Sequence, residues 1–72
     1  MQRLTIWMCR DLRDSAQSGF ARSKRQAEEY VATNRGYTDP SVCATEGWCE
    51  PAVQIEVPEP VASTLIKHCL FN

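Results

Sequence analysis

The sequence predicts an α+β fold with the element order β-β-α-β-α, in a single small domain that spans residues 1–72. Two runs, 4–9 and 52–57, alternate apolar and other side chains as strands do. Two others, 24–34 and 58–71, repeat apolar residues at helical spacing. With 72 residues, 43% of them hydrophobic, the chain has the composition of a folded domain. A chain of this size buries only about 60% of its unfolded surface.

Three segments are expected to form strands. The first is "LTIWMC" (4–9), and after the polar turn "RDLRDSAQ" (10–17) a weaker second strand, "SGFARS" (18–23), completes an antiparallel hairpin. The third strand is "AVQIEV" (52–57). In the first strand Trp7 points to the side opposite Ile6, because side chains alternate along a strand.

Both helices carry start signals. Ser23 followed three residues later by Gln26 fits a capping box for "KRQAEEYVATN", and Gly36 ends that helix. The second helix is "PEPVASTLIKHCLF", where Pro60 lies in the first turn and removes no needed hydrogen bond. Residues 37–51 between these elements are predicted to form one long loop, which is unusual in so small a domain.

The second strand, the first helix and the third strand are expected to form a crossover connection. The simplest arrangement then places the first strand in the middle, which gives a three-stranded antiparallel sheet in the strand order 2-1-3. Two helices would cover one face of this sheet. The predicted core is one cluster made of Leu4, Ile6, Met8, Phe20, Tyr30, Val31, Val53, Ile55, Val57, Leu65 and Ile66.

The segment "CATEGWC" raises the question of a metal site or a disulfide. Cys43 and Cys49 have five residues between them, more than the two to four of most zinc knuckles. Cys69 lies on the apolar stripe of the last helix, where a free cysteine behaves as a small hydrophobe. We therefore expect no cofactor and a reduced, ordered loop that covers the sheet through Val42, Ala44 and Trp48. The alternative is a zinc site that includes Cys43, Cys49 and Cys69.

The near-zero net charge and the lack of a catalytic motif disfavour several classes of function. Eight basic and nine acidic residues nearly cancel, which disfavours both a nucleic-acid binder and a nucleic-acid mimic. No spacing suggests a catalytic set, so we predict that the protein is not an enzyme. The N-terminal run "LTIWM" is too short for an export signal or a membrane span, which favours a cytoplasmic location without membrane association. A homodimer would add stability to so small a core and stays open.

The positions of the two tryptophans suggest where a protein partner could bind. If Ile6 faces the helices, Trp7 faces the open side of the sheet, where an exposed Trp is a typical anchor for a protein partner. We predict a partner-binding site with Trp7 at its centre and a polar surround made of Arg10, Asp11, Arg13 and Asp14. An equally weighted alternative is that the 37–51 loop folds across this face and Trp48 packs on Trp7.

Three segments, "LTIWMCRDLRDS" (4–15), "FARSKRQAEEYV" (20–31) and "VQIEV" (53–57), resemble a group of small proteins from tailed bacteriophages. The best match lies at Cys9, Asp11, Leu12, Asp14 and Ser15, while residues 37–51 depart from the pattern. The resemblance implies no catalytic residues. It suggests a phage accessory protein in the host bacterial cytoplasm that binds and inhibits or redirects a host protein, with a CRISPR–Cas complex as a candidate. The alternative is a small zinc- or nucleic-acid-binding module.

Overall fold

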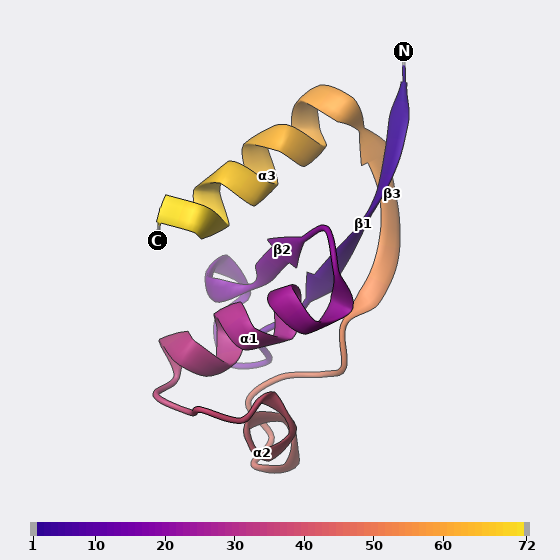
Figure 1. Ribbon diagram of the computed structural model, residues 1–72. Helices are drawn as coiled ribbons and strands as arrows, with labels where there is room; N and C mark the ends of the chain where they lie inside the picture. Colours follow the sequence, from indigo (N-terminus) through magenta and orange to yellow (C-terminus); the bar gives the residue numbers. More distant parts are fainter. Residues whose placement is uncertain (1, 72) are drawn as a thin grey trace.

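The computed structural model describes residues 2–71, except for the side chains of Leu70 and Phe71. Three strands and three α-helices occur in this range (Figure 1). In chain order the elements are β1 (Arg3–Cys9), a short 3-10 helix (Ser15–Gln17), β2 (Gly19–Ala21), α1 (Lys24–Asn34), α2 (Pro40–Thr45), β3 (Val53–Pro58) and α3 (Glu59–Phe71). The predicted succession of strands and helices is confirmed, and α2 is an addition inside the expected loop.

The sheet has the predicted strand order. Strand β1 lies in the middle, antiparallel to β2 on one side and to β3 on the other. Met8 is opposite Phe20 on β2 and Val53 on β3, and Ile6 is opposite Ile55. Because side chains alternate along each strand, these residues share one face of the sheet. Trp7, opposite Ala21 and Gln54, belongs to the other face.

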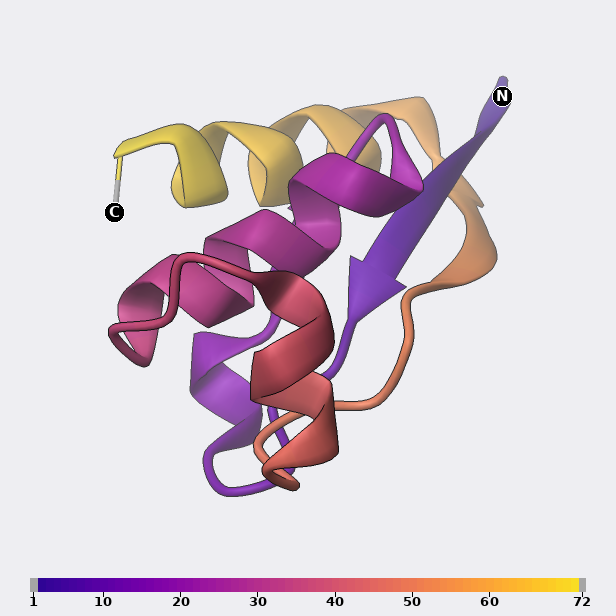
Figure 2. The ribbon, with the colours of Figure 1, turned by 60° about the horizontal axis from the view of Figure 1, so that its bottom comes forward.

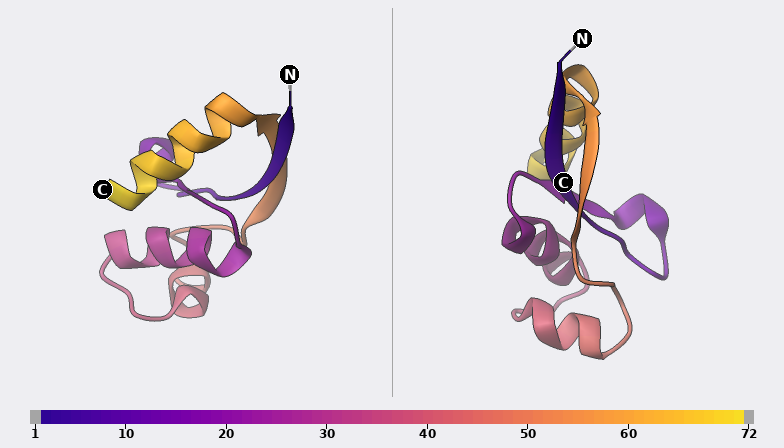
Figure 3. Two further views of the ribbon diagram at one scale, coloured as in Figure 1. Left: turned by 45° about the horizontal axis from the view of Figure 1, so that its top comes forward. Right: turned by 90° about the vertical axis from the view of Figure 1, so that its right-hand side faces the viewer.

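The expected placement of both helices on one face is wrong. Helix α1 packs its buried Ala27 and Val31 into the same cluster as Cys9 and Ala21, with Trp7 against it. Helix α3 runs on the opposite side of β2 (Figures 1 and 3). The small residues of β2 explain this close approach of α1. A Cβ atom at Gly19, for example, would lie 2.6 Å from the carbonyl oxygen of Ala27.

Two glycines end the first two helices in the same way. Gly36 and Gly47 have φ angles of 83° and 85°, the left-handed conformation that glycine adopts without strain. After α1, the N–H of Gly36 donates to Thr33 and that of Tyr37 to Ala32; after α2, the N–H of Gly47 donates to Ala44 and that of Trp48 to Cys43. These are Schellman caps, and each is followed at once by an aromatic residue. Figure 2 shows a loop that leads from the end of α1 back to α2, which lies alongside α1.

The best-buried side chains are smaller than predicted. The largest fully buried ones are those of Ile6, Val31, Cys9 and Cys43. Of the predicted single core, only Ile6 and Val31 are fully buried, and Val53 is 51% exposed. Instead, cysteines and alanines fill the α1 side: the buried cluster there consists of Cys9, Ala21, Ala27, Val31, Ala32, Cys43, Cys49 and Ala52. The prediction that large apolar residues form a single core is therefore wrong for the α1 side of the sheet.

Candidate functional site

The turn after β1 is built around the carboxylate of Asp11. Its side chain has no exposed surface and forms a bidentate ion pair with Arg35, the C-cap residue of α1, with both N···O distances 2.8 Å. One carboxylate oxygen also accepts the backbone N–H groups of Arg13 and Asp14, at 2.9 and 3.0 Å. The hydrogen bonds from Arg35 are the main reason that the pKa of Asp11 is lowered. Asp11 therefore fixes the turn from inside, and its predicted place on the polar surround of a binding site is wrong.

Trp48, which follows α2, contacts both this turn and Arg35. The guanidinium groups of Arg13 and Arg35 lie over its ring, each with its central carbon 4.8 Å from the ring centroid. The indole N–H donates to the hydroxyl of Tyr37 at 2.9 Å. Trp48 also accepts the backbone N–H of Leu12 at 2.9 Å, next to an antiparallel bridge between Asp11 and Cys49. The cation–π contacts and these hydrogen bonds tie the turn to the loop that follows α2.

The outward side of this turn carries both apolar and charged groups. Leu12 is 43% exposed, and Arg10, Arg13 and Asp14 are exposed beside it. Asp14 also accepts the N–H of Ala16 at 3.1 Å and so caps the 3-10 helix. We call the group of Arg10, Leu12, Arg13 and Asp14 the turn surface. Sequence reasoning singled out its three charged residues and missed Leu12, although a lone apolar residue inside a polar turn was the available signal.

Trp7 does not lie on an open face. It is half-buried and packs against the buried cluster beneath α1. Its direction, opposite to Ile6, was predicted correctly, but the expectation that the helices leave its side of the sheet uncovered is wrong. The alternative is borne out in that residues 37–51 pack on this side of the sheet. Cys43 and Cys49 belong to the cluster on which Trp7 lies, and Trp48 packs against the same cluster while its ring contacts two guanidinium groups.

The four cysteines are free and buried. Cys9, Cys43 and Cys49 share the cluster beneath α1, where the Cys9 thiol donates to the carbonyl of Glu50 at 3.3 Å. Cys69 lies apart on α3, and its sulfur accepts the N–H of Phe20 at 3.1 Å. The alternative zinc set with Cys43, Cys49 and Cys69 is therefore not assembled. Among the described residues, no group of three or more His, Cys, Asp or Glu side chains could hold a metal ion.

The electrostatics of these thiols oppose nucleophilic chemistry. Burial raises the pKa of Cys43 to about 11, and also raises the pKa of Cys9 and of Cys69. A reactive cysteine needs the thiolate, which a lowered pKa provides. Because burial raises their pKa values, Cys9, Cys43 and Cys69 stay protonated near neutral pH and act as packing groups.

A scan against protein-family models found no match to this chain, and neither did searches of curated proteins and of solved structures. The resemblance to phage proteins therefore stays a prediction. Within the described part of the chain, no helix combines the length and the apolar character that crossing a membrane requires.

Proposed function

We propose that this protein is a non-enzymatic binding protein that recognises a host protein through the turn surface. One observation carries the proposal: Leu12 and Arg13 are exposed on a turn whose backbone is held by the buried carboxylate of Asp11. A site of this kind loses little conformational freedom when a partner binds. Arginine is also enriched among the residues that dominate protein interfaces.

The buried ion pair supports this assignment. Taking Asp11 and Arg35 out of water is unfavourable unless both groups are well hydrogen-bonded, and their attraction often only compensates for that loss. A pair of this kind is weak evidence for stability by itself, but it does fix one conformation of the turn. A turn of fixed conformation with exposed side chains is suited to recognition.

The partner we propose is a bacterial host protein, with a defence component such as a CRISPR–Cas complex as the first candidate. The phage-like segments support this choice, together with a net charge of −1 that favours contact by shape over imitation of DNA. The zinc- or nucleic-acid-binding alternative has less support. An aromatic residue that stacks bases must be accessible on the sheet, and α1 packs over the side of the sheet that carries Trp7.

Capture from bacterial lysate tests the proposal. We expect immobilised wild-type protein to retain a host protein, and Leu12→Asp to lose most of that binding without a change in melting temperature. Val61→Asp is the matched control. Val61 is 45% exposed, close to the value for Leu12, and a carboxylate near the N-terminus of α3 is tolerated.

Two results would contradict the proposal. One is equal capture by Leu12→Asp and by the wild type; the other is that Val61→Asp loses binding to the same extent as Leu12→Asp. The CRISPR–Cas candidate has its own test in cells whose CRISPR–Cas system targets a phage. Expression of the wild type should restore plaque formation there, and expression of Leu12→Asp should not.

A further inference from the structure

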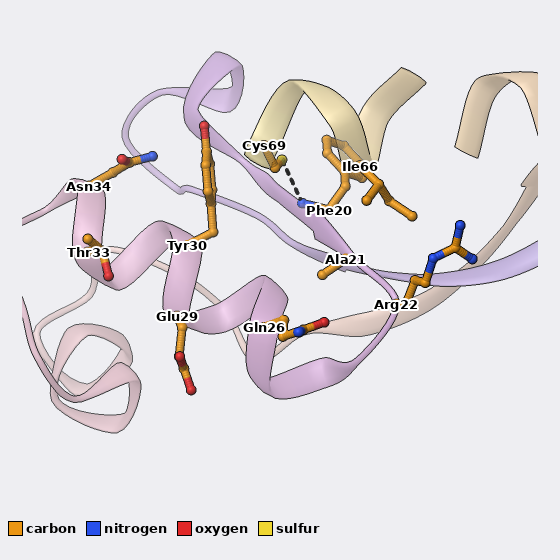
Figure 4. Close-up of a pocket in the computed structure, with 10 residues that line it drawn as sticks. All are labelled: Phe20, Ala21, Arg22, Gln26, Glu29, Tyr30, Thr33, Asn34, Ile66 and Cys69. Atoms are coloured by element: carbon orange, nitrogen blue, oxygen red, sulfur yellow. Dashed lines mark hydrogen bonds between the residues drawn. The ribbon is translucent and has the colours of Figure 1, made fainter. Parts of the chain in front are cut away.

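A groove lies between α1 and α3, along the outer edge of β2 (Figure 4). Its volume is about 530 Å³, within the range of pockets that hold small molecules. Apolar side chains from all three elements form its walls, among them Phe20 from β2, Tyr30 from α1 and Ile66 from α3. Each of these three is only half-buried, so the groove leaves apolar surface in contact with water.

The groove does not offer a free strand edge. The N–H of Phe20 on β2 already donates to the sulfur of Cys69, which belongs to α3. In Figure 4 this bond runs from the strand to the last turns of the helix. A peptide that added to β2 as a further strand would have to displace α3, because strand addition needs the main-chain groups of the edge. The occupant must therefore contact side chains.

The charge at the groove is unbalanced. Arg22, one of the lining residues, is exposed and makes no ion pair within the described part of the chain. The one lining carboxylate, Glu29, is paired with Arg25 in the preceding turn of α1. Figure 4 shows Glu29 directed away from Phe20 and Ile66. An uncompensated cation beside an apolar wall is complementary to a ligand with an apolar body and a negative charge.

We propose that this groove binds an anionic amphiphile, a small molecule with an apolar body and a carboxylate, sulfonate or similar group. The apolar body contacts Phe20, Tyr30 and Ile66, and the anionic group lies at Arg22. This site uses none of the residues of the turn surface, so it stands or falls independently of the proposed protein partner.

Two fluorescent probes of similar apolar shape test the site. The first is 8-anilinonaphthalene-1-sulfonate, which is anionic, and the second is the neutral N-phenyl-1-naphthylamine. We expect both to shift the backbone amide resonance of Phe20, whose N–H faces Cys69 at the groove. Arg22→Gln should weaken binding of the anionic probe about three- to fivefold, the effect of one exposed charge pair, and leave the neutral probe unaffected.

Lys24→Gln is the control, because Lys24 is a nearby exposed cation that does not line this groove. It should bind both probes as the wild type does. The proposal is overturned if Lys24→Gln weakens the anionic probe as much as Arg22→Gln does, or if Arg22→Gln weakens both probes alike. It is also overturned if the folded protein binds neither probe, or if the amide of Phe20 does not shift at saturation.

Discussion

The two faces of the sheet are closed by different means. Beneath α1, small residues and thiols are almost completely buried, and α1 approaches β2 so closely that Gly19 has no room for a side chain. On the α3 side, Ile6 and Ala62 are fully buried, but Val53 is 51% exposed. The face with the larger aliphatic residues is therefore the less completely covered one. In this short chain, the small residues on the α1 side are buried more completely than the alternating aliphatic residues of β3, which are Val53, Ile55 and Val57.

Breaking the buried ion pair should have the largest effect. Asp11→Ala removes the buried acceptor of hydrogen bonds from Arg35 and from two backbone N–H groups, and a hydrogen bond to a charged group typically contributes about 1.5–3 kcal/mol. The loss of several such bonds is comparable with the whole stability of about 3–5 kcal/mol expected for so small a domain. We expect the variant to be largely unfolded at 25 °C by circular dichroism.

Glu56→Ala provides the control for this experiment. It removes the exposed ion pair with Arg3 and should change the free energy of unfolding by about 0–1 kcal/mol. If Asp11→Ala and Glu56→Ala unfold at the same urea concentration, the interior position of Asp11 does not determine the stability of the turn.

Truncation of Ile6 tests the α3 face. Ile6 is 1% exposed, and Ile6→Ala should lower the free energy of unfolding by about 2–4 kcal/mol, measured by urea titration. Val53→Ala, on the same face of the neighbouring strand β3, should have a much smaller effect because about half of Val53 is already exposed to water. Equal effects of the two variants would mean that α3 covers this face evenly, contrary to the comparison.

Adding a methyl group to Gly19 tests the α1 face. In Gly19→Ala the new Cβ would lie 2.6 Å from the carbonyl oxygen of Ala27, a backbone atom that no rotamer change can move away. We expect a loss of about 2–3 kcal/mol, typical of overpacking. Gly47→Ala is the control: nothing lies within 4 Å of its new Cβ, and only the positive φ opposes it, at about 1 kcal/mol. A smaller loss for Gly19→Ala than for Gly47→Ala would contradict the close packing of α1.

Local signals in the sequence predicted the elements well. Ser23 accepts the N–H of Gln26 as the capping box requires, and Gly36 ends α1 as expected. Helix α2 was missed because six residues are too few to show a helical period, although Asp39 caps it and Pro40 follows in its first turn. Its cap at Gly47 repeats the stop signal recognised at Gly36.

The candidate site depends on contacts that no local pattern contains. Asp11 and Arg35 are 24 residues apart, and their pairing follows from the packing of α1 on the side of Trp7. A pattern of alternating valines indicated which face of β3 is apolar, but not which face each helix would cover. Once α1 was assigned to the wrong face, Trp7 appeared exposed and Asp11 appeared to be a surface residue. The polar turn 10–17 was nevertheless predicted as a turn, because its Asp and Ser residues favour one.

Lowering the pH should gradually reduce the contribution of Asp11 to the free energy of unfolding. Of the changes predicted here, we expect this one to be the smallest. The pKa of Asp11 is lowered in the folded protein, mainly by hydrogen bonds from Arg35, from about 3.9 in an unfolded chain. A group with a lowered folded pKa stabilises the protein fully above its unfolded pKa, and this stabilisation is lost as the pH falls through the folded pKa. The difference in unfolding free energy between the wild type and Asp11→Asn should therefore narrow below about pH 4.

Urea titrations at several pH values between 7 and 3 measure this difference. The control is Ile6→Val, which removes one buried methyl group and introduces no titrating group. Its unfolding free energy should stay below that of the wild type by the same amount at every pH. If the wild type and Asp11→Asn also stay separated by a constant amount, the charge on Asp11 does not stabilise the fold. The α1 side would then be held by the packing of its small residues alone.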